Sequence, residues 1–146
     1  MSEPISHLLA AQLALRNRFD DFRQAFSRKD RTALEIALAD FEQQFRRWTE
    51  AEEQALVPAV VRAGIPGRDP HREMRLEYVQ IRELTRYLMR QIEEGIRPND
   101  LAGFVDNLDR RLRAHEAEME KIYYPAAIVT LTQEEWGILL AAQPEL

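Results

Sequence analysis

One acidic side chain stands out between Leu38 and Pro58, because it interrupts an otherwise apolar helical pattern. Residues three and four positions apart share one face of an α-helix. Here that face carries Leu38, Phe41, Phe45, Trp48, Glu52, Ala55 and Ala59. A carboxylate on the axis of such a stripe loses its hydration when the helix packs, which is costly unless it is paired, protonated or bound to a metal. Glu52 is therefore the first candidate for chemistry.

The second half of the chain repeats this pattern when the numbering is shifted by about 67 positions, and its odd member is His115. Two helices that each place a potential ligand on the inward seam suggest a site inside a helical bundle. A shift of about 71 positions places His7, in the first helical segment, over Tyr78 in the third. The shift of 67 aligns Phe41, Phe45, Trp48, Glu52, Ala55 and Pro58 with Leu108, Leu112, His115, Met119, Ile122 and Pro125.

These residues resemble the hemerythrin-like (HHE cation-binding) family over nearly the whole chain, from about residue 3 to residue 127. The resemblance implies two helix pairs, with a ligand histidine on the first and third helices. It also implies an HxxxE motif, followed by an apolar residue and proline, on the second and fourth. Of the six ligand positions, three keep a family residue, so the implied metal ligands are His7, Glu52 and His115. The other three positions hold Trp48, Tyr78 and Met119.

The substituted positions argue against a two-metal centre of the family's usual kind. Trp48 has no ligating atom, Tyr78 ligates only as a phenolate, and Met119 is a soft donor poorly matched to iron beside hard oxygen ligands. Two histidines and one carboxylate are the ligand count of a mononuclear site. The expected cofactor is a single iron or other divalent metal, or none.

Each of these residues also has a purely structural interpretation. Glu52 can form an ion pair with an arginine such as Arg82, or with His115, inside the bundle. His115 can be a core histidine that donates to a carbonyl group. Large side chains on the seam, namely Trp48, Tyr78 and Met119, are most simply core residues.

The periodic segments predict an all-α fold, because every one of them fits the helical period and none fits a strand. We expect an antiparallel up-down-up-down four-helix bundle with a short fifth helix at the C-terminus. Pro58 should kink the second helix or loosen a turn just after the candidate site. The predicted helices run from Ser2 or Glu3 to about Ser27, from about Thr32 to Ala63, from near Asp69 to Gly95, from the Pro98-Asn99 turn through Ile122, and from the Thr132–Glu135 capping-box pattern through Leu140.

Composition indicates one domain, residues 1–146, with 45% hydrophobic and 31% charged residues. The net charge of -5 is mixed along every segment, so we expect neither nucleic acid nor a membrane surface as a partner. The chain has no cysteine, which excludes disulfides and thiol chemistry. The acidic start MSEPISHLL is unlike a signal peptide, and the expected location is the cytoplasm.

Three hypotheses for function follow. The first, which we favour, is a non-catalytic binding or regulatory bundle with a degenerate di-iron centre and a protein partner that the sequence does not identify. The second is a residual mononuclear metal site that senses or binds a small ligand such as oxygen or nitric oxide. The third is a stress-response metalloenzyme that uses this metal, although no further catalytic constellation accompanies it.

Overall fold

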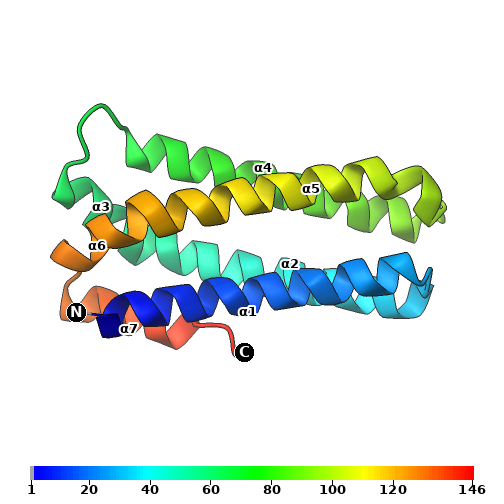
Figure 1. The fold of residues 1–146 in the computed structure, drawn as a ribbon, viewed down its shortest axis with the longest axis horizontal. Coiled ribbons are helices and arrows are strands. Elements are labelled where there is room, and N and C mark those ends of the chain that lie inside the picture. The colour runs from blue at the N-terminus through cyan, green and yellow to red at the C-terminus, as the bar shows by residue number, and fades with distance from the viewer. Residues whose placement is uncertain (1) are drawn as a thin grey trace.

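The computed structural model describes residues 2–146, and side chains from Pro4 onward. Over these residues the protein is helical and contains no strand. Figure 1 shows the long helices lying along one axis, with the chain reversing direction between α1 and α2 and between α4 and α5. The elements are α1 (Ser2–Ser27), α2 (Arg31–Ala51), η1 (Glu52–Leu56), α3 (Val57–Ala63), α4 (Pro70–Glu93), α5 (Pro98–Glu118), η2 (Met119–Tyr123), α6 (Tyr124–Thr130) and α7 (Gln133–Ala142).

The helix boundaries agree with those predicted from capping residues and turn signals. The Asp30 carboxylate accepts from the Ala33 amide at the start of α2, and Asp69 does the same for Arg72 at the start of α4. Thr132 and Glu135 form the predicted capping box at the start of α7. Each cap satisfies amides that have no partner within the helix.

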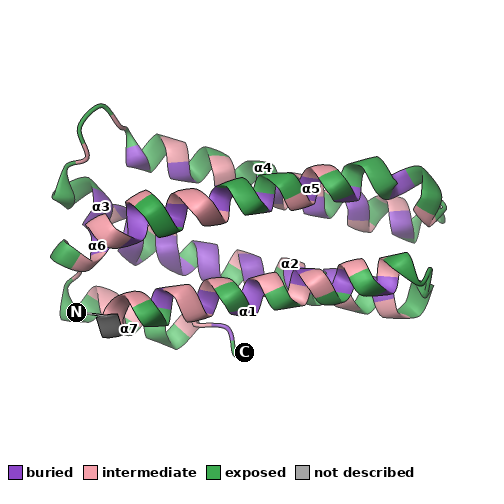
Figure 2. Ribbon diagram, viewed as in Figure 1, coloured by how far each residue is buried: buried purple, intermediate pink, exposed green. Residues whose placement is uncertain are grey.

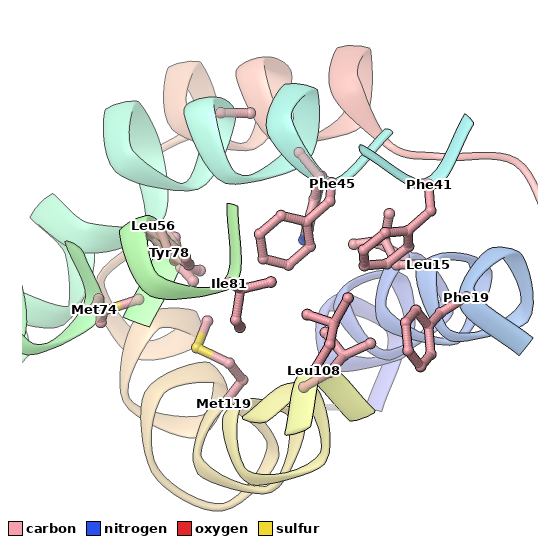
Figure 3. Close-up of a cluster of buried hydrophobic side chains, with 14 of the residues drawn as sticks. Leu15, Phe19, Phe41, Phe45, Leu56, Met74, Tyr78, Ile81, Leu108 and Met119 are labelled. Atoms are coloured by element: carbon pink, nitrogen blue, oxygen red, sulfur yellow. The ribbon is translucent and has the colours of Figure 1, made fainter. Parts of the chain in front are cut away.

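The apolar stripes of the long helices meet in one continuous core (Figure 2). α1 packs along α2, α4 contacts both α2 and α5, and α3 packs against α6. Figure 3 shows aromatic and aliphatic side chains from several helices pointing into a shared cluster, among them Phe41, Phe45 and Leu108. α7 covers η1 and α2 from outside.

A polar contact reinforces the packing of α1 on α5. The guanidinium of Arg16 contacts Asp109 at 2.8 Å and Glu116 at 2.9 Å, and the Arg16 side chain is only 12% exposed. Such charge-assisted hydrogen bonds are stronger than neutral ones. They fix α1 near the level of the candidate site.

No described helix is both long enough and apolar enough to cross a lipid bilayer.

Candidate functional site

Two π-helical segments hold the central residues of the site. η1 begins at Glu52 and η2 begins at Met119, the two positions that the sequence repeat aligns. In each segment a backbone amide bonds five residues back, from Val57 to Glu52 and from Tyr124 to Met119. The wide turn of η1 confirms the predicted disturbance near Pro58, but it begins at Glu52 itself and not just after the candidate site. The corresponding wide turn of η2 was not predicted.

The prolines explain these wide turns. Proline has no amide to donate and its ring crowds the carbonyl four residues earlier in an α-helix. Pro58 and Pro125 directly follow the widened turns, in the first turns of α3 and α6, where proline is well tolerated. π segments of this kind occur frequently at functional sites.

Glu52 lies in the core, 1% exposed, with both carboxylate oxygens hydrogen-bonded. The Tyr78 hydroxyl donates to Oε1 at 3.1 Å, and the Tyr124 hydroxyl donates to Oε2 at 3.1 Å. We call these three residues the Glu52 cluster. It joins the η1, α4 and α6 segments, which are distant in sequence. The ion pair predicted with Arg82 or His115 is therefore wrong, because tyrosine hydroxyls satisfy the carboxylate instead.

Burial dominates the acid–base behaviour of the cluster. Removal from water raises the pKa of Glu52 to about 8, although the hydrogen bonds from Tyr124 and Tyr78 lower it. At neutral pH the carboxyl group is therefore mostly protonated, and the core holds little net charge. When Glu52 carries its proton, one of its oxygens becomes a donor, and the tyrosine facing that oxygen must accept.

Both tyrosines remain protonated over the physiological range. Burial raises the pKa of Tyr78 and of Tyr124 well above the ordinary value, and the nearby Glu52 charge raises both further. The side chain of Trp48, one helical turn before Glu52, lowers the pKa of Tyr124. Tyr78 therefore takes part in the polar network, beyond the core-filling role that size alone predicts.

His115 lies beside this cluster, 7% exposed, with its ring edge-on to the Tyr78 ring at 5.5 Å between centroids. Its Nδ1 lies 2.6 Å from Oε1 of Glu77. Burial lowers the pKa of His115 to about 4. The neutral imidazole can therefore donate its Nδ1 proton to the Glu77 carboxylate, rather than to the carbonyl group that the sequence suggested.

A chain of polar contacts leads from His115 to the surface between α4 and α5. Burial raises the pKa of Glu77, and the hydrogen bond between Glu77 and Glu118 raises the pKa of Glu118. Arg68 contacts Glu118 at 3.0 Å and the Tyr123 hydroxyl at 3.3 Å. Glu77 and Glu118 line a surface groove of about 390 Å³ that His115 also lines. His115 thus separates this groove from the Glu52 cluster.

The three predicted metal ligands are not gathered at one point. Glu52 and His115 are both in the core and both line a cavity of about 10 Å³, whereas His7 is exposed on α1. The His7 ring lies edge-on to Trp136, with 6.5 Å between centroids. Among residues 2–146 no group of three or more histidine, cysteine, aspartate or glutamate residues is arranged to hold a metal ion.

The remaining family positions are filled by buried side chains. Met119 is fully buried and points into the core cluster (Figure 3). Trp48 is 2% exposed and lies where the resemblance would place an imidazole. In the same region the Gln12 side chain donates to the backbone carbonyl of Glu116 at 3.2 Å, and both residues line the 10 Å³ cavity. That volume corresponds to about one water molecule.

Sequence reasoning missed two residues of this site, Tyr124 and Glu77. Tyr124 immediately precedes Pro125, so the proline signal marks its position, but nothing in the sequence indicates that its hydroxyl reaches Glu52 across the core. Glu77 precedes the seam residue Tyr78 and reads as part of a solvated helix face. Its contact with His115 depends on the packing of α4 against α5.

The comparisons with known proteins add no relative. No protein-family model matches the chain, and no significant match is found among curated proteins or solved structures. The hemerythrin-like resemblance therefore remains a prediction that rests on the residues of this chain.

Proposed function

We propose that the chain is a non-catalytic binding or regulatory module, built as an antiparallel four-helix bundle of the hemerythrin-like kind. In this proposal the place of the metal centre is taken by the Glu52 cluster. The pairing of α1 with α2, and of α4 with α5, supports the bundle arrangement (Figure 1). The coincidence of both π segments with the aligned family positions supports the resemblance.

A single observation carries the proposal: both oxygens of Glu52 are hydrogen-bonded to tyrosine hydroxyls. A buried carboxylate calls for a cation only while its charge is uncompensated. Here the two hydroxyls, together with a pKa near 8, give the carboxyl group a satisfied state without any metal. One of these hydroxyls belongs to Tyr78, at a position where the resemblance implies a ligand. A tyrosine at position 78 therefore replaces the implied histidine ligand and also supplies a hydrogen-bond partner for Glu52.

A second candidate function is a residual site for one metal ion or a small diatomic ligand. The cavity of about 10 Å³ favours it, because Glu52 and His115 both line this space. Glu52 and His115 would supply two of the ligands, and the remainder would have to come from solvent or the bound molecule. A stress-response enzyme would need this metal as well, so it depends on the same observation.

Elemental analysis of the purified protein tests these alternatives. After purification without chelator we expect well under one equivalent of any transition metal, in wild type and in Glu52→Gln alike. His71→Ala is a matched control, because His71 is an exposed histidine near the start of α4. About one equivalent that is lost in His115→Ala and Glu52→Gln but kept in His71→Ala would overturn the proposal in favour of the second candidate.

Restoring the implied ligands tests the resemblance itself. The triple variant Trp48→His, Tyr78→His, Met119→Glu would recover the six family ligand types, provided that His7 approaches the site. We expect increased iron binding by a folded triple variant, because the helix positions are already in register. A helical, folded variant that binds no more iron than wild type would contradict the hemerythrin-like alignment.

A further inference from the structure

A separate cavity lies at the other end of the molecule from the Glu52 cluster. Figure 1 shows the α1–α2 turn and the α4–α5 turn at one end of the long helices, with α3 and α6 at the other. The cavity between these two turns has a volume of about 150 Å³. It is lined by Phe26, Lys29, Arg31, Leu34, Ile92, Gly95, Ile96, Arg97 and Pro98.

The lining of this cavity divides into an apolar part and a cationic part. Lys29, Arg31 and Arg97 are the charged members, and no acidic residue lines the cavity. Arg31 pairs with Glu35 and Arg97 pairs with Asp100, whereas no ion pair engages Lys29 among the described residues. The unpaired Lys29 ammonium group and the lack of an acidic lining residue favour an anionic ligand.

Arg31 is held in place by neighbours that leave part of its guanidinium available. Its Nη2 donates to the Ile92 carbonyl at 2.6 Å, and its Nε donates to Glu35 at 2.9 Å. No hydrogen bond engages its Nη1 among the described residues, and this nitrogen lies beside Gly95. Gly95 has a φ of 87°, a backbone conformation that favours glycine at this turn.

Lys29 occupies a backbone conformation that glycine would adopt with less strain. Its φ of 57° makes it the one non-glycine residue with positive φ in the described chain. Left-handed backbone is unfavourable for a residue with a Cβ atom. No ion pair or hydrogen bond engages the Lys29 ammonium group among residues 2–146. This conformation ends α1, where the Lys29 amide donates to the Phe26 carbonyl and the Asp30 amide donates to the Ala25 carbonyl. The exposed ammonium group of Lys29 remains available to a ligand.

The apolar part of the cavity limits the size of the ligand. Leu34 and Ile92 are buried, and Phe26 and Ile96 are partly exposed beside them. An apolar protein cavity of about 150 Å³ lined by leucine, isoleucine and phenylalanine accommodates a benzene ring. The volume here is the same, so a single aromatic ring fits it and a drug-sized molecule does not.

We propose that this cavity binds a small aromatic carboxylate, with the ring against Phe26, Leu34 and Ile92 and the carboxylate between Lys29, Arg31 and Arg97. A guanidinium nitrogen and an ammonium group are both strong donors to a carboxylate. This site goes beyond the function proposed above and does not depend on the Glu52 cluster.

Phenylacetate is the probe for this site, measured by calorimetry and by amide chemical-shift changes in ¹⁵N-labelled protein. We expect shifts concentrated at the amides of Lys29, Gly95 and Ile96. Benzyl alcohol and benzylamine have the same ring with a neutral or a positive group, and acetate has the charge without the ring. Phenylacetate should bind more tightly than all three. Equal affinity for benzylamine, or shifts centred elsewhere on the protein, would overturn the proposal.

Two substitutions separate binding from folding. Lys29→Gly relieves the backbone strain while removing the cation, and Arg97→Gln removes a second, exposed cation. Each should weaken phenylacetate binding by up to about fivefold, the upper end of the range for a solvent-exposed ion pair. The control is Lys121→Gln, which removes an exposed cation remote from the cavity.

A substitution that fills the cavity gives an independent measurement. Ile96→Trp places a ring at a partly exposed position of the lining, so it should abolish phenylacetate binding with the helical spectrum unchanged. Unchanged affinity in Lys29→Gly, Arg97→Gln and Ile96→Trp would show that the ligand does not occupy this cavity.

Discussion

The pH dependence of folding stability tests the Glu52 cluster directly, through the substitution Glu52→Gln. Glutamine keeps the size of the side chain and its capacity for hydrogen bonds to Tyr78 and Tyr124, but it does not titrate. The pKa of Glu52 is about 8 in the folded protein against 4.5 for the free side chain. The folded state therefore holds this proton more tightly. The resulting stability is fully present below pH 4.5 and is lost as the pH rises through about 8.

Between the two pKa values, Glu52 is ionised in the unfolded chain but protonated in the folded protein. In this range the free energy of unfolding falls by about 1.4 kcal/mol per pH unit. His115 acts in the opposite direction, since its lowered pKa of about 4 removes stability as the pH falls from 6.5. The two effects oppose each other between pH 4.5 and 6.5, so the Glu52 contribution should stand out above 6.5. Between pH 6.5 and 8 we expect it to lower the free energy of unfolding by about 2 kcal/mol.

The assay is urea denaturation followed by circular dichroism across this pH window at constant ionic strength. Glu52→Gln should gain stability relative to wild type as the pH rises. Glu120→Gln is the matched control, because it removes the same charge at an exposed position of η2 and should stay parallel to wild type. A difference between wild type and Glu52→Gln that stays constant from pH 6.5 to 8 would refute the raised pKa of Glu52.

Three further substitutions test other contacts. Tyr124→Phe leaves one Glu52 oxygen without its hydrogen-bond partner, so it should cost about 1 to 3 kcal/mol in urea denaturation. Because that hydrogen bond lowers the pKa of Glu52, its removal should also extend the pH-dependent loss of stability to higher pH. Arg16→Gln separates α1 from Asp109 and Glu116, and thermal denaturation should show a loss of about 1 to 3 kcal/mol that shrinks at high salt. Thr132→Ala removes the capping box of α7 and should cost about 1 kcal/mol, with faster amide exchange in the first turn of that helix.

The helices could be predicted because their signals are local. Asp30, Asp69 and the Thr132–Glu135 pair act on amides within one turn of themselves, so the sequence alone places the starts of the helices. The apolar spacing around Phe41 and Leu108 likewise identifies the buried faces. Pro58 indicated a disturbance, but not that it would begin at Glu52, and the corresponding turn at Met119 was not predicted.

The partners inside the site could not be predicted, because they depend on how helices pack. Glu52 was identified from its position on an apolar stripe, and it is buried as expected. Its partners Tyr78 and Tyr124 come from segments 26 and 72 residues away in sequence. His7 was identified through the family resemblance, which implies a ligand inside the bundle, whereas its side chain is exposed on α1.

The two π segments restrict which insertions and deletions the chain can accept. Each wide turn accommodates one more residue than an α-helical turn, and each is followed by a proline that benefits from this extra space. Deleting one residue from η1 would restore the α-helical turn and press Pro58 against the carbonyl of the turn before it. Replacing Pro58 alone would leave the wide turn in place, although no proline ring would then need the extra space. The extra residue and the proline are therefore linked, and a viable variant should lose both together or keep both.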